Sequence, residues 1–373
     1  MDATDIARSA GWPCLFDINE VTLNPCARGA GSGIGMGKTS TLTEVAEEAG
    51  VSLITASRAL RGVGRVAKET RERVLAAAAK LDYTPDMIAQ KMRGGNSSLI
   101  GVFVNGFRSL VMHELLSAIN DEARRLGFDL IVFNADHFDD ARRAGTAEML
   151  RKLCDGLLLI LPDANDGLLV KLERAHAPCV LVSFAARSID LPVVLGSNRL
   201  AAKSAVDHLL GLGHRRIAFI AGTSFTGQSE ERQRGYEDAL RAAGIAIEPA
   251  YVRQGDFNDA SGFEQTQALL KLPAPPTAIF AANDAMAFGA MDAISSAGMK
   301  VPDDVSVVGF DDVIRAAVVH PKLTTVRQPL NEIAVRAVAE LVDAMRSGRA
   351  EGFRIELPAR LVVRESTGPA PAA

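Results

Sequence analysis

The spacing of apolar residues divides the chain into two patterns. Between Thr41 and about Arg93, apolar residues recur every three or four positions, which predicts short amphipathic helices. Beyond Leu99, continuous apolar runs alternate with amphipathic stretches, which is typical of parallel strands joined by helices. The second pattern extends over more of the chain than a single sheet usually takes, so it predicts two α/β lobes.

Strands and helices of the second pattern can be assigned from its runs and gaps. The runs suited to buried strands lie at 99–104, 129–133, 156–161, 180–184, 216–221, 277–281 and 305–310. The gaps that fit helices lie at 110–126, 139–153, 199–211, 230–243, 259–270 and 284–297. Because small ligands bind beyond the carboxyl ends of the strands in such sheets, a ligand site is expected there.

The first pattern contains the signature of a helix-turn-helix. Thr41 and Glu44 form a capping-box sequence, in which the threonine side chain caps a helix and the glutamate reaches back. Gly50 ends this helix, and Ser52 can cap a second helix that runs through Leu60. Two short helices joined by so tight a turn fit a helix-turn-helix, whose second helix enters the DNA major groove.

Further helical segments follow this pair. A third helix is predicted over 68–81, and Pro85 opens a short fourth segment over 86–93. A linker of glycine, asparagine and serine at 94–98 then separates these helices from the α/β region. The helices therefore form a module of their own.

The N-terminal stretch has a different character. Residues 1–38 hold a glycine cluster but no helical or strand period, so a disordered leader is expected. Gly37-Lys38-Thr39 resembles the end of a phosphate-binding loop, but Ser32 stands where that loop needs glycine. Met36, just before the first predicted helix, is a candidate start of translation.

Charge is unevenly distributed between these parts. The chain carries 41 lysines and arginines against 45 aspartates and glutamates, a net charge of −4. Residues 37–95 carry ten basic and seven acidic side chains, so this segment is +3 and the remainder is −7. Positive charge is therefore concentrated where phosphates would be contacted. A helical bundle with a solvated basic face is the alternative that spacing and charge leave open.

Composition argues against several other classes of protein. The four cysteines, Cys14, Cys26, Cys154 and Cys179, form no C-x-x-C and have no histidine at zinc-finger spacing. No apolar run approaches the roughly 18 residues of a membrane span, and the acidic N-terminal stretch lacks a secretory signal. A reduced, cytoplasmic protein without a metal or cofactor is therefore expected.

Sequence signatures of common enzymes do not occur in the α/β region. G-x-S-x-G, H-E-x-x-H and G-x-G-x-x-G are all missing from it. His208 and His214 are six positions apart and do not share a helix face, so a surface or helix-end role is expected for them rather than metal binding. The protein is therefore predicted not to be an enzyme.

Several motifs occur together along the chain. The first is Thr41-Leu-Thr-Glu-Val-Ala-Glu-Glu-Ala-Gly-Val-Ser52, followed by Thr55-Ala-Ser-Arg-Ala-Leu60. Far downstream lie Ala282-Asn-Asp-Ala-Met-Ala-Phe-Gly-Ala290 and Val301-Pro-Asp-Asp-Val-Ser-Val-Val-Gly-Phe-Asp-Asp312. These motifs resemble the lactose/galactose-repressor (LacI/GalR) family of transcription regulators, in the family's order. The resemblance implies an N-terminal all-α helix-turn-helix module and a two-lobed α/β domain with parallel sheets, similar to periplasmic binding proteins.

The resemblance also implies where the domains begin and end. The helix-turn-helix DNA-binding domain would span 39–95, with a hinge helix at 86–93. The effector-binding domain would span 96–368. Its first lobe would take about 98–196 and 327–352, and its second lobe about 197–326 and 353–366.

The family's DNA-contacting positions can be carried over residue by residue. They are Thr41, Ser52, Leu53, Ile54, Thr55, Ser57, Arg58, Met92 and Arg93. Leu53 and Ile54 match the positions that mainly set operator sequence, and as apolar residues they suit thymine methyl groups. The alternative is that one of them packs inside the module. Met92 stands where the family's hinge helix wedges a leucine into the minor groove, and methionine is apolar and adaptable enough for that role.

Ligand-contacting positions of the family fall in the α/β region. They are Arg232, Asn283, Asp311 and Phe257, with Asp163, Arg108 and His113 as further candidates. The planar fork of Arg232 suits ligand hydroxyls or carboxylates, and Asp311 can accept hydrogen bonds from two hydroxyls. A ring at Phe257 would lie against the apolar face of the ligand. A turn or helix cap is the alternative for Asn283 and Asp311, and core packing is the alternative for Phe257.

These observations predict a sequence-specific repressor controlled by a small effector between the lobes. Arg108 and His113 are cations where the family often has aromatic residues, so a sugar acid is considered beside a sugar. One module buries too little surface for tight specific binding, so a homodimer would read a near-palindromic double-stranded operator. The alternatives are a sugar-binding protein without a transcriptional role and an α/β enzyme.

Overall fold

The computed structural model describes residues 40–61, 64–83, 97–107, 109–135, 140–163 and 167–371. It divides into two compact units, Met1–Pro85 and Asp86–Ala373. The predicted leader 1–38 with Met36, the predicted hinge helix 86–93 with Met92 and Arg93, and Arg108 lie outside the described residues. The predictions made for them stay predictions.

The described part of the first unit holds three helices: α2 (Leu42–Glu48), α3 (Leu53–Arg61) and α4 (Lys68–Lys80). The predicted capping box is confirmed, because the Thr41 hydroxyl accepts from the Glu44 N–H and the Glu44 carboxylate accepts from the Thr41 N–H. Gly50 has a φ of +62°, a conformation that glycine adopts easily, and this allows the tight turn into α3. The core is made of small side chains on all three helices: Val45, Ala46, Ala49, Ala56, Ala59, Val74, Ala77 and Ala78.

Two six-stranded sheets form the second unit. The first has the order β11-β5-β4-β3-β1-β2, and every neighbouring pair in it is parallel. Its strands are β1 (Leu99–Val104), β2 (Asp129–Asn134), β3 (Gly156–Ile160), β4 (Cys179–Val182), β5 (Pro192–Gly196) and β11 (Phe353–Leu357). Helices α6 (Leu110–Arg125), α7 (Asp140–Leu153), α8 (Gly167–Ala175) and α13 (Leu330–Ser347) complete this lobe.

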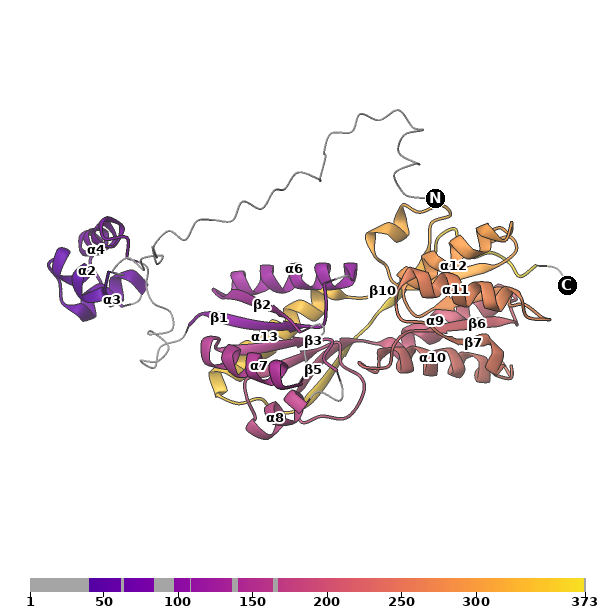
Figure 1. Ribbon diagram of the computed structural model, residues 1–373, viewed down its shortest axis with the longest axis horizontal. Coiled ribbons are helices and arrows are strands. Elements are labelled where there is room, and N and C mark those ends of the chain that lie inside the picture. The colour runs from indigo at the N-terminus through magenta and orange to yellow at the C-terminus, as the bar shows by residue number, and fades with distance from the viewer. Residues whose placement is uncertain are drawn as a thin grey trace, which may run out of the picture. The chain divides into compact units, whose positions relative to one another are not determined.

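Alternation along the strands separates two cores in the first lobe. Leu157 and Leu159 of β3 pack with α7 and α8, whereas Leu158 and Ile160 pack with α6 and α13 on the other face (Figure 1). Because successive side chains of a strand point to opposite faces, a continuous apolar run buries both faces of the sheet. This confirms the interpretation of the apolar runs as buried parallel strands.

The second sheet has the order β12-β10-β9-β8-β6-β7 and is parallel except for β12, which pairs antiparallel with β10. Its strands are β6 (Ile217–Ala221), β7 (Val252–Gln254), β8 (Ala278–Ala281), β9 (Ser306–Asp311), β10 (Thr324–Arg327) and β12 (Arg360–Val362). Its α-helices are α9 (Asn198–Gly211), α10 (Gln228–Ala242), α11 (Asp259–Leu270) and α12 (Asp284–Ser296). The 3-10 turns η1 (Pro249–Tyr251) and η2 (Ile314–Ala317) belong to the same lobe.

One predicted boundary between the lobes is wrong. Residues 353–366 were all assigned to the second lobe, but β11 pairs with β5 in the first sheet over Phe353–Leu357. The chain reaches the second sheet only at β12, where Arg360–Val362 pair with β10. The sequence Phe-Arg-Ile-Glu-Leu alternates apolar and charged residues, as an edge strand requires, and nothing in that pattern says which sheet it joins.

The expectation of a surface or helix-end role for His214 needs correction as well. His214 follows the end of α9 but is fully buried. Its ring nitrogens lie 3.0 Å from the Thr277 hydroxyl, 3.1 Å from the Ser306 hydroxyl and 3.0 Å from the Gly368 carbonyl oxygen. His214 therefore holds the chain near Gly368 against the second lobe, which is a structural role.

Candidate functional site

Helix α3 presents the side chains expected to read DNA. Leu53 and Ile54 are 49% and 64% exposed, so neither packs inside the module, whereas Ala56 and Ala59 on the opposite side are buried. The two side chains are neighbours in sequence and both point outward, so together they form a small apolar surface that a partner can cover. The helix therefore offers an apolar tip at its N-terminal end.

Polar groups surround this tip. Ser52 and Arg58 are exposed, and Thr55 and Ser57 are half-buried. The Ser52 hydroxyl accepts from the Thr55 N–H at 3.2 Å, which is the predicted helix cap. Thr41 caps α2, and its contact with a phosphate stays a prediction. The first unit thus holds the described DNA-contacting candidates on one helix and at the start of another.

The second site is built around Arg232, in the first turns of α10. This arginine is only 2% exposed, and its guanidinium lies 3.8 Å from the centre of the Phe310 ring. Its Nε donates to Asn198 Oδ1 at 2.9 Å, and its Nη1 donates to the Ala282 carbonyl oxygen. Burial lowers the pKa of Arg232, while Asp311 and Asp284 act in the opposite direction. A guanidinium fixed on this many partners is preorganised for a ligand.

Asp311 faces Arg232 from the end of β9. One carboxylate oxygen lies 3.8 Å from Arg232 Nη1 and accepts from Gln328 Nε2 at 2.7 Å. Burial raises the pKa of Asp311 to about 6, although Arg232 and Gln328 lower it. Asp311 and Asp312 have φ angles of +125° and +62°, so the chain leaves the sheet in a strained turn. Strain of this kind is common at ligand sites.

Two neighbouring carboxylates support this turn, and sequence reasoning missed both roles. Asp284, 1% exposed, accepts from the Thr325 hydroxyl at 2.5 Å and from the Val313 N–H at 2.9 Å. Burial raises the pKa of Asp284 well above its ordinary value, and the charge of Asp311 raises it further. Asp312 accepts from Arg327 Nε at 2.5 Å and from Arg364 Nη2 at 2.6 Å. Both residues hold the turn that presents Asp311.

Asn283 and Phe257 lie together at the carboxyl ends of β8 and β7. Asn283 caps α12 by accepting from the Met286 N–H at 3.0 Å, and its Nδ2 donates to the Phe257 carbonyl oxygen at 2.9 Å. Phe257 has a φ of +70°, and its ring fills the space where a side chain at Gly222 would lie. The cap and packing alternatives therefore describe what these residues do here, and their ligand contacts stay predictions.

The first lobe places one further carboxylate, Glu114, near the site, and the predictions for Arg108 and His113 stay predictions. His113 lies exposed in the first turn of α6, and Asp163 is half-buried after β3. Glu114, next to His113, is close enough for Asp312 to raise its pKa, which burial also raises. Glu114 in turn raises the pKa of Asp311.

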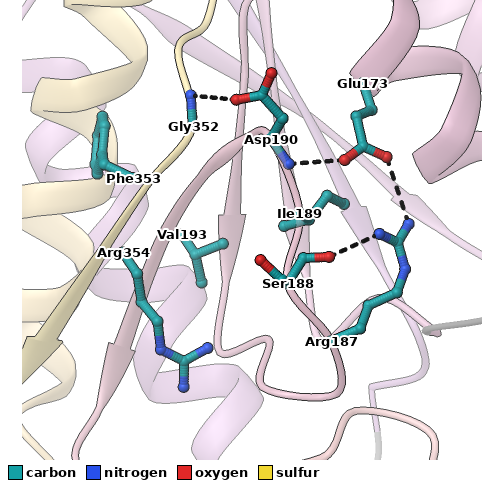
Figure 2. A pocket seen from close by; sticks show the side chains of 9 residues that line it. All are labelled: Glu173, Arg187, Ser188, Ile189, Asp190, Val193, Gly352, Phe353 and Arg354. Carbon is teal, nitrogen blue, oxygen red and sulfur yellow. Dashed lines mark hydrogen bonds and ion pairs between the residues drawn. The ribbon is translucent and has the colours of Figure 1, made fainter.

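A separate cavity of about 510 Å³ lies in the first lobe, beside β5 and β11. Figure 2 shows that Glu173 contacts two other lining residues: it accepts from the Asp190 N–H at 2.7 Å and lies 3.7 Å from Arg187. Asp190 accepts from the Gly352 N–H at 3.2 Å. None of these residues belongs to the Arg232 cluster, so the cavity is separate from that site.

Other kinds of site were sought in the described ranges. No three His, Cys, Asp or Glu side chains gather there in a way that could hold a metal ion. No described helix has both the length and the apolar character of a membrane span.

Comparison with family models and known proteins gives a consistent result. Residues 41–86 match the model "Bacterial regulatory proteins, lacI family", and residues 206–367 match "Periplasmic binding protein-like domain". The transcriptional repressor CytR of Escherichia coli K12 is 33% identical over 328 residues, which cover 88% of this chain and 96% of CytR. Catabolite control protein A of Priestia megaterium is 30% identical over 88% of this chain and 99% of its own length.

Solved structures agree with these relatives. A lac repressor dimer bound to operator and the anti-inducer ONPF has a TM-score of 0.79 and 32% identity, covering 89% of this chain and 100% of that chain. A complex of the regulator CelR with cellobiose has a TM-score of 0.68 and 30% identity, covering 88% and 99%. The likeness therefore extends over both units of the chain.

Proposed function

Because the chain belongs to the LacI family of bacterial regulatory proteins, we propose that it is a repressor whose affinity for operator DNA is controlled by a sugar bound at the Arg232–Asp311 pair. The relatives that it matches over nearly their full length are regulators of transcription and not enzymes. A non-transcriptional sugar-binding protein and an α/β enzyme are therefore set aside.

One observation carries the effector part of the proposal. A buried guanidinium, Arg232, and a carboxylate whose side chain is only 10% exposed, Asp311, lie 3.8 Å apart at the carboxyl end of β9. Such a pair can donate to and accept from the hydroxyl groups of one polyol, while Phe257 offers an aromatic face close by. Both neutral sugars and sugar acids carry the hydroxyl groups that this pair can bind. One relative of this fold binds a disaccharide, cellobiose.

The DNA-binding part of the proposal rests on α3. Leu53 and Ile54 would contact thymine methyl groups, and Arg58 would contact the backbone or a guanine. We propose a homodimer that reads a near-palindromic operator, because a single module buries too little surface for specific binding. A lac repressor dimer bound to operator shows this arrangement for a related protein. We place the protein in the cytoplasm, where its operator would be.

The DNA-binding proposal is tested by a gel shift with genomic fragments at about 150 mM salt, where nonspecific phosphate attraction is weak. The full-length protein is expected to retain a small set of fragments against an excess of random duplex. Retention of no specific fragment would reject the proposed function. A thermal-shift screen of neutral sugars and sugar acids then identifies the effector, because a bound ligand raises the melting temperature.

Asp311 makes effector binding dependent on pH. An ionised Asp311 accepts two hydroxyl hydrogen bonds, whereas a protonated one accepts fewer, so effector affinity is expected to fall below a pH of about 6. Well below this pH, the effector affinity is expected to fall by at most about tenfold per pH unit. Isothermal titration calorimetry between pH 5 and 8 measures this affinity, and the ligand is the sugar that gives the largest thermal shift. Affinity that rises toward pH 5 would contradict the assignment of Asp311.

The same group sets the sign of a stability change. Burial raises the pKa of Asp311 from an ordinary value of 3.8 to about 6, so the folded protein binds more protons than the unfolded chain between these values. The contribution of Asp311 to the free energy of unfolding therefore decreases as the pH rises from about 4 through 6. The Asp311→Asn variant is the control, because it lacks both this stability change and the pH dependence of binding.

A further inference from the structure

The two lobes are joined by three crossovers, which lie at Ser197, at 328–329 and at 358–359 (Figure 1). Hydrogen bonds hold the first and third together: the Ser197 N–H donates to the Leu357 carbonyl oxygen at 2.8 Å, and the Ala359 N–H donates to the Ser197 hydroxyl at 3.1 Å. A side chain at Gly196 would lie only 3.3 Å from Gln328 Oε1, so the first and second crossovers are also close. The three crossovers form one structural element.

Each residue of the ligand pair is bonded to a different crossover. Arg232 Nε donates to Asn198 Oδ1 at 2.9 Å, directly after the first crossover. Gln328 Nε2, on the second crossover, donates to Asp311 Oδ1 at 2.7 Å. Asn198 also donates to the Gly196 carbonyl oxygen at 3.0 Å, which fixes its amide to the same crossover.

Both links are shielded from water. Asn198 is 4% exposed and Gln328 is 8% exposed. Hydrogen bonds to a charged group are about twice as strong as neutral ones, and a buried group that loses its partner has no water to replace it. A change in the position or charge of Arg232 or Asp311 must therefore move the amides that are bonded to them.

Arg232 reaches the first lobe by a further route. Its Nη2 donates to Gln228 Oε1 at 3.3 Å, and Gln228 Nε2 donates to the Ser183 carbonyl oxygen at 2.8 Å. The same guanidinium thus contacts the second lobe, a crossover and a residue that holds the first lobe. Its surroundings are sensitive to the angle between the lobes.

We propose that Asn198 and Gln328 are positioning residues, which link the Arg232–Asp311 pair to the crossovers and thereby couple effector occupancy to the angle between the lobes. This inference rests on the proposed function, because it explains how a sugar at that pair would change the operator-binding state. A ligand shifts such an equilibrium only through its different affinities for the two states, so the proposal requires that these bonds differ between them.

The test measures the distance between the lobes in the full-length protein without ligand or DNA. Spin labels are placed at Lys171→Cys on α8 and Ala242→Cys on α10, both exposed positions. Cys14 and Cys26 are changed to serine, and the buried Cys154 and Cys179 are kept. Labelled protein is diluted with unlabelled protein, so that each assembly carries one labelled chain.

The variants distinguish loss of the hydrogen bonds made by Asn198 and Gln328 from loss of side-chain packing. Gln328→Met and Asn198→Leu keep the volume but remove the bonds to Asp311 and Arg232. Gln233→Met on α10 is the matched control, because the Gln233 amide donates to Glu237 and not to the pair. Circular dichroism melting checks that each variant is folded.

Gln328→Met and Asn198→Leu are each expected to shift the distance distribution, while Gln233→Met matches the wild type. Asp311→Asn is expected to shift it as well, with no further shift when combined with Gln328→Met. Distributions of Gln328→Met and Asn198→Leu that superimpose on the wild type would overturn the inference. Shifts of Asp311→Asn and Gln328→Met that simply add would also overturn it, because they would show two independent effects.

The distance measurement remains a valid test of the inference even if the gel shift rejects the proposed function, because it uses no DNA. Where the gel shift yields an operator fragment, the same variants are titrated on it with and without the sugar of largest thermal shift. The sugar is expected to change operator affinity about 5- to 150-fold in the wild type and to have little effect in Gln328→Met. An unchanged sugar response in Gln328→Met would overturn the inference.

Discussion

Replacing Arg232 by methionine is expected to lower the free energy of unfolding of the second unit by about 3–5 kcal/mol. The guanidinium is 2% exposed and balances Asp311, so its removal leaves a buried carboxylate without its counter-charge. The Asn198 and Ala282 oxygens lose a donor as well. Urea denaturation followed by far-ultraviolet circular dichroism measures the change.

Arg234→Met is the matched control for this substitution. Arg234 lies two positions away on the same helix, but its side chain is 57% exposed and pairs only with Glu231 at the surface. Surface pairs of this kind contribute about 0–1 kcal/mol. Arg232→Met should also lose the thermal shift caused by the sugar, whereas Arg234→Met should keep it. A stable Arg232→Met protein that still responds to the sugar would show that the pocket lies elsewhere.

Replacing Arg58 by alanine is expected to weaken operator binding about 5- to 150-fold, the effect of losing one good contact worth about 1–3 kcal/mol. Arg58 is exposed on α3, on the helix that presents Leu53 and Ile54. Because α3 belongs to the first unit, the thermal shift caused by the sugar should remain. Fluorescence anisotropy with an operator duplex measures the affinity.

A charge-matched control distinguishes this contact from a general loss of positive charge. Lys152→Ala removes one cation from an exposed position on α7, in the second unit, where Lys152 pairs with Glu148. Its effect on operator affinity should be small. Equal losses in Arg58→Ala and Lys152→Ala, or loss of the sugar response in Arg58→Ala, would contradict the modular assignment.

The sequence predicted the parts of the fold that carry strong periodicity. The runs that became β1, β3, β6, β8 and β9 are continuous and apolar, because both faces of each strand are buried. The strands β5, β7, β10 and β12 were not assigned, and the segment that forms β11 was placed in the wrong lobe. Val252–Gln254 has no pattern of its own and becomes a strand only because β6 pairs with it.

The candidate site could be predicted only in part from the sequence. Arg232 and Asp311 lie in motifs that the family resemblance singles out. Their partners lie far away in sequence, since 34 residues separate Arg232 from Asn198 and 17 separate Asp311 from Gln328. A role for Asp284 at the site was easier to predict from the sequence, because Asp284 follows Asn283 directly at the end of a strand. Spacing along the chain carries no signal for contacts made by two crossovers, so Asn198 and Gln328 emerged only from the structure.

The most direct test of the account is the affinity of the full-length protein for its operator, measured by fluorescence anisotropy with and without a saturating sugar from the thermal-shift screen. The account predicts that the sugar changes the dissociation constant about 5- to 150-fold, which is the usual range of coupling between two sites. A sugar that stabilises the protein but leaves the operator dissociation constant unchanged would contradict it.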